Sequence, residues 1–208
     1  MSIFYHEQLY RSAEVMRRAR EQFVTVCGAG ALGANILESL ARSGFNRLRV
    51  VDRDRVEERN LSTQPFYRTD VGAQKAKILA NSLYRALSVN VEARCEELTK
   101  RNARKLLDGL VIDAFDNSVG REAVKTACEE MKLECLHVGL ASSYAEVIWN
   151  DRYRVPSAAQ DDICDYPLAR NLATLTASVA CEAIVRYVAD GTRESFTITL
   201  RDFAIKRF

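Results

Sequence analysis

Three glycines are the first residues of this chain whose type and spacing predict chemistry. Gly28, Gly30 and Gly33 have the spacing GxGxxG, after the apolar run FVTVC and before the helix-compatible segment ANILESLARSG. In a strand, turn and helix unit of this kind, glycines let backbone N–H groups approach a diphosphate at the positive end of a helix. The pattern predicts phosphate binding and leaves NAD, FAD and ATP open.

Asp52 follows the next strand-like run, RLRVV, about twenty residues after the glycines, where a carboxylate can accept hydrogen bonds from ribose hydroxyls. To this point a dehydrogenase fits equally well. The polar side chains that come next are suited to a triphosphate rather than to nicotinamide: Asp54, Arg59, Asn60, Gln64 and Lys75.

Asp116 and Asn117 follow the continuous apolar run LVIDAF, which is typical of a buried parallel strand. A carboxylate beside several phosphates is best explained as a magnesium ligand. Lys75 would supply a mobile positive charge to the polyphosphate, and Asp116 would orient the metal and the leaving group. Together these residues predict nucleotidyl transfer with loss of pyrophosphate.

The elements that must position these residues alternate along the chain. An amphipathic helix is expected within residues 1–22, and strands and helices alternate over residues 23–140. Within that core, one helix is expected from Gly72 to Leu87, and a short helix is expected in RNARKLLDG, where Gly109 ends it. Residues 141–208 follow with short strands at AEVIWN and YRV, a polar loop, a long helix closed by Gly191, and two antiparallel strands. This order predicts a single α/β domain: a Rossmann-like, doubly wound, mostly parallel sheet with helices on both faces and an antiparallel C-terminal extension.

Composition narrows the class of protein. The chain has 208 residues, 48% of them hydrophobic, and a formal charge of +2 from 30 basic and 28 acidic residues, so no nucleic-acid or membrane surface is indicated. The six cysteines include no CxxC pair. No charged and then apolar leader opens the sequence, and no apolar run approaches the roughly 18 residues that span a bilayer. We therefore expect a cytoplasmic protein.

Five motifs in order, GAGALG, VDRD, RNLSTQ, GAQKAK and FDN, carry a resemblance to a known family. Over roughly residues 20–190 the chain resembles the ubiquitin-activating-enzyme-like adenylyltransferases of the ThiF/MoeB/HesA family. The resemblance implies an enzyme that uses ATP and Mg²⁺ to adenylate the C-terminal carboxylate of a small ubiquitin-like or sulfur-carrier protein ending in Gly-Gly. It also implies a homodimer.

The resemblance assigns roles to individual residues. Asp52 would hold the ribose, Asn60 and Lys75 would contact phosphates, and Asp116 would hold magnesium, while a carboxylate nucleophile needs no general base. The glycine turn and the polar loops complete the expected nucleotide site: Gly28, Ala29, Gly30, Ala31, Leu32, Gly33, Asp54, Gln64 and Asn117.

Three features depart from the family pattern. NLSTQ places Thr63 where the family has a phosphate-binding arginine, and Arg59 or Arg68 could reach the phosphates instead. In the N-terminal segment HEQLYR, Glu7 stands at the position from which family members often offer an arginine to the partner protomer, with Arg11 one turn later. The paired CxxC motifs that hold zinc in many members are missing, so packing alone must stabilise the C-terminal part.

Cys164 and His137 are each open to a functional or a structural interpretation. Cys164 lies in the loop before the last long helix, where family members often carry a cysteine that accepts the carrier. Neighbouring acids would raise the pKa of that thiol, so an ordinary loop cysteine is the other interpretation. His137 is expected to be a satisfied interior histidine, and three cysteines in apolar patterns are expected in the core: Cys27, Cys135 and Cys181.

Two other functions remain open. Thr63 and Glu7 favour a non-catalytic subunit that binds a nucleotide or a partner, and the glycines with Asp52 are compatible with an NAD-dependent oxidoreductase. A basic cluster, MRRAR, could contact a carrier protein or RNA, although a solvated helix face is the favoured interpretation.

Overall fold

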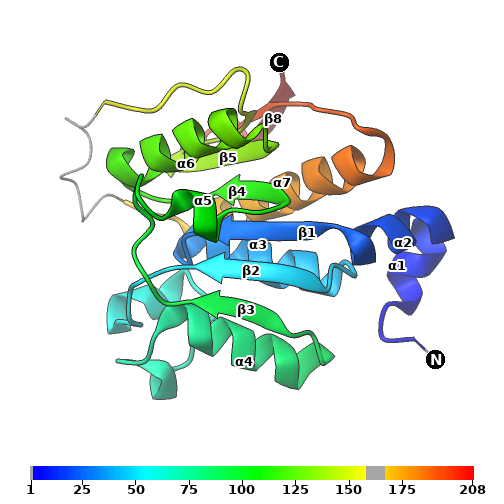
Figure 1. The fold of residues 1–208 in the computed structure, drawn as a ribbon, viewed down its shortest axis with the longest axis horizontal. Coiled ribbons are helices and arrows are strands. Elements are labelled where there is room, and N and C mark those ends of the chain that lie inside the picture. Colours follow the sequence, from blue (N-terminus) through cyan, green and yellow to red (C-terminus); the bar gives the residue numbers. More distant parts are fainter. Residues whose placement is uncertain (1, 158–166) are drawn as a thin grey trace.

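The described residues form one eight-stranded sheet with helices on both faces (Figure 1). A computed structural model of the chain describes residues 2–157 and 167–208. The strand order is β3, β2, β1, β4, β5, β6, β7, β8. Pairs from β3 to β5 are parallel, and pairs from β5 to β8 are antiparallel. The predicted fold class, including its antiparallel end, is confirmed.

The strands coincide with the apolar runs of the sequence. All four residues of β4 are buried, as expected for a parallel strand that is covered on both faces. The bounds are β1 Phe23–Cys27, β2 Arg47–Val51, β3 Val91–Arg94, β4 Leu110–Asp113, β5 Cys135–Ala141, β6 Tyr144–Trp149, β7 Phe196–Thr199 and β8 Ala204–Arg207.

The helices cover two separate cores. Alternate residues of β4 belong to different cores. Ile112 belongs to the core that includes side chains of α3, α4 and α7, whereas Val111 belongs to the core that includes side chains of α5 and α6. The helices are α1 Tyr5–Tyr10, α2 Ala13–Glu21, α3 Ala31–Arg42, α4 Lys75–Leu87, α5 Ala103–Leu106, α6 Ser118–Met131 and α7 Arg170–Asp190, with 3-10 turns η1 Glu58–Ser62 and η2 Arg68–Asp70.

The N-terminal segment is two helices rather than the single one expected. The helix is interrupted at Arg11 and Ser12, and the Ser12 hydroxyl accepts a hydrogen bond from the Val15 N–H at 3.2 Å. A serine whose side chain satisfies a free N–H at the start of a helix favours a new helix over a continuous one. Helix α1 contributes no buried residue, and at its C-terminal end Arg11 pairs with Glu182 of α7.

Three element boundaries also differ from expectation. Residues 153–155 form no strand, because Tyr153 is buried against a histidine ring instead of joining the sheet. Helix α4 begins at Lys75 rather than at Gly72, whose φ of +89° is incompatible with a helix. Helix α5 ends before Gly109, which instead permits close approach to Phe23.

Helix α7 is the longest element and forms part of the core. Among the described residues it is the one helix long and apolar enough to cross a membrane, a test that core helices also pass. Its apolar side chains contact α3 and the strands β5 and β6, and the buried positions along it include Leu172, Ala177 and Ile184. As predicted, Gly191 ends the helix, with a φ of +82° and its N–H donating to Tyr187.

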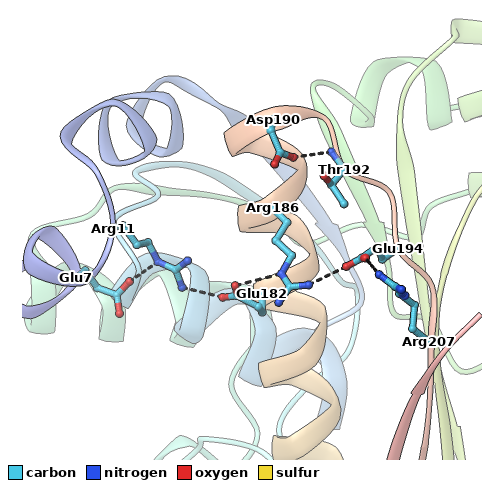
Figure 2. A network of polar contacts seen from close by, with 8 residues as sticks. All are labelled: Glu7, Arg11, Glu182, Arg186, Asp190, Thr192, Glu194 and Arg207. Carbon is cyan, nitrogen blue, oxygen red and sulfur yellow. Dashed lines mark hydrogen bonds and ion pairs between the residues drawn. The ribbon is translucent and has the colours of Figure 1, made fainter.

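A chain of alternating charges joins α1, α7 and the last strand (Figure 2). Arg11 pairs with Glu7 and with Glu182, both at 2.8 Å. Beyond Glu182, further ion pairs along α7 and into the C-terminal strands involve Arg186, Glu194 and Arg207. The pairs on the exposed side contribute little stability individually, but Arg11 is mostly buried and connects α1 to α7.

The packing of α6 generates a matched pair of substitutions. Val124→Ala should lower the free energy of unfolding by about 2 kcal/mol, because the side chain of Val124 lies on the buried face of α6 and is fully buried. On the same helix Val119 is 75% exposed, so Val119→Ala should change that free energy by less than about 0.5 kcal/mol. Urea unfolding of both variants measures the difference, and equal losses would contradict this orientation of α6.

Candidate functional site

The glycine turn joins β1 to α3 at the carboxyl edge of the sheet. Gly28 has a φ of +96°, and its N–H donates to the Val51 carbonyl at 2.8 Å. A Cβ at Gly33 would lie 2.0 Å from the Gly28 carbonyl oxygen, so only glycine fits there. Around Gly30, the N-cap of α3, a Cβ would meet no atom within 4 Å. The turn is therefore tightly closed on its inner side and open beside the helix N-terminus.

Asp52 holds this turn in place. Its carboxylate accepts the Ala29 N–H on one oxygen and the Asp54 N–H on the other, both at 2.6 Å. Burial raises the pKa of Asp52, although the two N–H groups and the nearby charge of Lys75 act in the opposite direction. An ionised carboxylate has about four acceptor sites, so this one can still accept hydroxyl donors.

Lys75 reaches the same acidic residues from the first turn of α4. Its Nζ lies 3.6 Å from Asp54 Oδ2, and its backbone N–H donates to the Asp54 carbonyl at 3.0 Å. The Lys75 side chain is only 9% exposed. The structure thus brings Lys75, from the motif GAQKAK, together with Asp52 and Asp54 of the motif VDRD.

The loop that carries Asn60 uses its side chains partly for its own structure. Asn60 Oδ1 accepts the Glu57 N–H at 2.9 Å and thereby caps η1. Thr63 is buried, and its carbonyl accepts a hydrogen bond from Asn35 of α3 at 3.0 Å. Gln64 is also buried, and within the described residues its Oε1 has no hydrogen-bond partner.

The two arginines considered as substitutes for the family arginine at position 63 are exposed. Arg59 pairs with Glu57 at 2.6 Å. Arg68 begins the exposed turn η2.

The loop after β4 lies directly against the glycine turn. The Ala114 N–H donates to the Cys27 carbonyl at 2.9 Å, and a Cβ on Gly28 would come within 2.9 Å of the Ala114 carbonyl oxygen. Asp116 is exposed on this loop. Asn117 caps α6 by accepting the Gly120 N–H at 2.8 Å, and its amide donates to Asp116 at 3.2 Å. Strands β1 and β4 are neighbours where the strand order reverses, which is where such sheets bind ligands.

Behind this loop lies a buried cluster that sequence reasoning identified only in part. His137 is an interior histidine, as expected, with both ring nitrogens hydrogen-bonded. The sequence did not predict its partners Asp113 and Arg121, which are buried with it. An acid at the end of an apolar strand, followed by an arginine in the next helix, is the signal that could have indicated the pair.

The cysteine predictions divide into two groups. Cys27, Cys135 and Cys181 are buried core residues, as predicted, and burial raises the pKa of each thiol. Cys128, for which the sequence offered no context, is buried in the core between α5 and α6. Cys164 lies outside the described residues, so its role stays a prediction.

Comparisons with known proteins agree on one family and one fold. The model of the ThiF family matches residues 5–199. A sulfur carrier protein adenylyltransferase from Thermus thermophilus is 40% identical over 131 residues, which are 59% of this chain and 48% of that relative. The chain spans about half, or less, of the length of the curated relatives it matches.

Solved structures share the fold at low sequence identity. E. coli MccB aligns with a TM-score of 0.83 and 16% identity over 98% of this chain and 67% of that one. E. coli tRNA N6-threonylcarbamoyladenosine dehydratase aligns with a TM-score of 0.79 and 18% identity, over 90% of this chain and 94% of its own. At such identities the likeness concerns the fold alone.

The glycine turn generates one prediction. Gly33→Ala should lower the free energy of unfolding by about 1 to 3 kcal/mol, because the added Cβ collides with a backbone oxygen. Gly30→Ala should cost less than about 1 kcal/mol, since its Cβ enters open space. Urea denaturation distinguishes the two variants, and a larger loss for Gly30→Ala would contradict the geometry of the turn.

The buried Asp113 generates a second prediction, with a defined pH dependence. Burial alone would raise its pKa, but the charge of Arg121 and the hydrogen bond from His137 hold the pKa of that carboxyl below its ordinary value of 3.8. Asp113→Asn should therefore cost about 3 to 5 kcal/mol at neutral pH, because Arg121 is left buried without its partner.

The sign of the pH effect follows from that lowered pKa. The stabilisation by Asp113 is fully present above its ordinary pKa and is lost as the pH falls through the lowered value, so the difference between wild type and Asp113→Asn should narrow in acid. Chemical unfolding of both proteins at pH 7 and near pH 3 measures this difference in the free energy of unfolding. As a control, Asp116→Asn on the exposed loop should change stability by less than about 0.5 kcal/mol. A stability difference between wild type and Asp113→Asn that widens in acid would contradict the lowered pKa of Asp113.

Proposed function

Because the chain belongs to the ThiF family, we propose that it is an ATP-dependent adenylyltransferase that activates the C-terminal carboxylate of a small carrier protein. One observation carries the proposal: the glycine turn, the acid and lysine group of Asp52, Asp54 and Lys75, and the loop with Asp116 meet at the carboxyl edge of the sheet. These groups supply phosphate donors, a ribose acceptor, a cation and an exposed carboxylate in one place.

The described residues fit ATP. Open space beside Gly30 lets phosphates approach the N–H groups at the start of α3, and the unpaired Gln64 Oε1 is an acceptor for a ligand donor. Asp52 can accept the ribose hydroxyls in addition to the two N–H groups it already holds. Asn60 uses its carbonyl as a cap, which leaves its amide NH₂ for a phosphate oxygen.

Asp116 is the residue we propose as a magnesium ligand. No group of three or more His, Cys, Asp or Glu side chains in the described residues is arranged to hold a metal alone. Mg²⁺ is typically bound by one or two carboxylates together with substrate phosphates and water, and a single exposed carboxylate suits that mode. When bound, the ion would neutralise charge on the phosphates.

The proposed reaction joins the carrier to AMP. A carboxylate oxygen of the carrier attacks the α-phosphorus of ATP, the bond from that phosphorus to the bridging oxygen breaks, and pyrophosphate leaves. Lys75 stabilises the negative charge that develops on the phosphates, because its ammonium is largely buried and held in place. The glycine turn and Asp52 orient the nucleotide, which is the other large contribution to such a transfer.

The kind of partner is inferred from the relatives. The sulfur carrier adenylyltransferases among them support a small ubiquitin-like or sulfur-carrier protein, for which we propose a C-terminal Gly-Gly. We further propose a homodimer in the cytoplasm. Arg59 and Cys164 are proposed as accessory residues, Arg59 near the phosphates and Cys164 as a later acceptor of the carrier.

A non-catalytic subunit is the second candidate, and it too has a specific observation in its favour. The residue at the position of the family's phosphate arginine is the buried Thr63, and Glu7 engages Arg11 within the same chain. Both departures remove positive charge that the family brings to ATP. Such a protein would bind a nucleotide, or a partner, without transferring AMP.

Exchange of radiolabelled pyrophosphate into ATP tests the proposed function. Wild-type protein should catalyse the exchange only with a carrier ending in Gly-Gly. Asp116→Ala should reduce it by at least about a hundredfold, because electrostatic groups at phosphate sites typically contribute that much. Cys164→Ala should retain it, since adenylation precedes any transfer to a thiol.

Three outcomes separate the candidates. Equal loss in Asp116→Ala and Cys164→Ala would contradict the roles assigned to the two residues. ATP binding by calorimetry without exchange for any carrier encoded nearby would favour the non-catalytic subunit. Absence of ATP binding would exclude adenylation and would favour a purely structural subunit that binds a partner.

A further inference from the structure

The buried cluster behind the Asp116 loop centres on the carboxylate of Asp113. Asp113 Oδ2 lies 2.8 Å from His137 Nδ1 and 3.5 Å from Arg121 Nη1. Asp113 and His137 are fully buried, and Arg121 is 8% exposed. Asp113 and His137 are also direct neighbours across the β4 and β5 pair, so the sheet register sets their contact.

His137 has a partner on each side of its ring. Nδ1 faces Asp113, and Nε2 lies 2.8 Å from the side-chain oxygen of Asn150. Tyr153 stacks on the imidazole, with ring centroids 3.7 Å apart and planes 11° from parallel. The ring therefore has very little freedom to rotate or shift.

Arg121 fixes the cluster from the side of α6. Its Nη2 donates to the Val138 carbonyl at 2.9 Å, and its Nη1 donates to the Tyr153 hydroxyl at 3.1 Å. These bonds satisfy the guanidinium while its charge compensates Asp113. The cluster thus connects the end of β4, the first turns of α6, the strand β5 and the segment after β6.

The cluster acts on the candidate site through one backbone hydrogen bond. Asp113 Oδ1 accepts the N–H of Phe115 at 3.2 Å, and Phe115 immediately precedes Asp116. Phe115 also lies beside the glycine turn, because its ring would meet a Cβ on Gly28 at 3.4 Å. The orientation of the Asp113 carboxylate therefore sets the path of the loop that presents Asp116.

We infer that His137 is a positioning residue for the candidate site: its Nδ1 bond orients Asp113, and Asp113 holds the loop 114–117 against the glycine turn. This inference rests on the proposed function for its effect on adenylation, whereas its effect on the loop is independent of that function. Residues that orient a metal ligand from behind typically change metal affinity or activity by about 10 to 100-fold when altered.

Two substitutions separate the contacts of the histidine ring. An asparagine amide reaches the position of Nδ1, so His137→Asn retains a donor for Asp113 and loses the contact with Asn150. A glutamine amide reaches the position of Nε2, so His137→Gln retains the contact with Asn150 and loses the donor for Asp113. Both variants remove the imidazole ring that stacks on Tyr153, so loss of the ring is common to the two.

Amide hydrogen exchange of residues 114–117 in the free protein is the first measurement. Exchange should be about tenfold faster in His137→Gln and within about threefold of wild type in His137→Asn. The second measurement is the Mg²⁺ concentration that gives half-maximal pyrophosphate exchange, which should rise about tenfold in His137→Gln only. The urea midpoint of each variant serves as the folding control.

The outcomes distinguish failure of this inference from failure of the proposed function. Equal exchange rates of the loop in the two variants, or unchanged protection in His137→Gln, would overturn the positioning role. Absence of pyrophosphate exchange in wild type would overturn adenylation, while hydrogen exchange would still decide the role of His137. Should both variants fail to fold, Tyr153→Phe removes one acceptor of Arg121 and keeps the stacking. Faster amide exchange of residues 114–117 in Tyr153→Phe would support the claim that the cluster holds this loop in place. Unchanged exchange would contradict that claim.

Discussion

The contact between the glycine turn after β1 and the loop after β4 is the constraint on which the candidate site depends. A side chain at Gly33 would collide with the Gly28 carbonyl, and a side chain at Gly28 would collide with the Ala114 carbonyl. With no side chain between them, the two strand ends converge at the point where the strand order reverses. Asp52, which accepts the N–H of Ala29 in the turn, and Asp116, on the loop after β4, are positioned by the two segments that form this contact.

Charge is distributed over the site in two layers. Near the proposed ligand, the ammonium of Lys75 lies close to the carboxylates of Asp52 and Asp54, which limits the cost of burying Asp52 and Lys75. Behind the loop, Asp113 and Arg121 form a second pair, and both of its side chains are buried. A buried pair of this kind is weak evidence for stability, and its geometric consequence for the loop is the more informative property.

The departures from the family pattern lie in groups that bring positive charge to the nucleotide. Thr63 is packed beside α3, and Glu7 joins Arg11 in the ion pairs that connect α1 to α7 and the C-terminal strands (Figure 2). In this chain the N-terminal helix is therefore tied to its own domain by Arg11. Lys75 is the buried cation that the described residues place directly at the acidic group of the site.

Local patterns in the sequence determined the alternation of strands and helices, the glycine turn and the end of α7 at Gly191, because periodicity and backbone preference act over a few residues. The order of five motifs further indicated the family. The caps formed by Ser12, Asn60 and Asn117 were not predicted, although each is a contact over three residues that local preferences favour. Only the tertiary structure decided that Asp113, Arg121 and His137 form one cluster and that Lys75 lies beside Asp54. These last contacts become available only when separate strands and helices meet, and no local pattern encodes which distant partner a side chain will take.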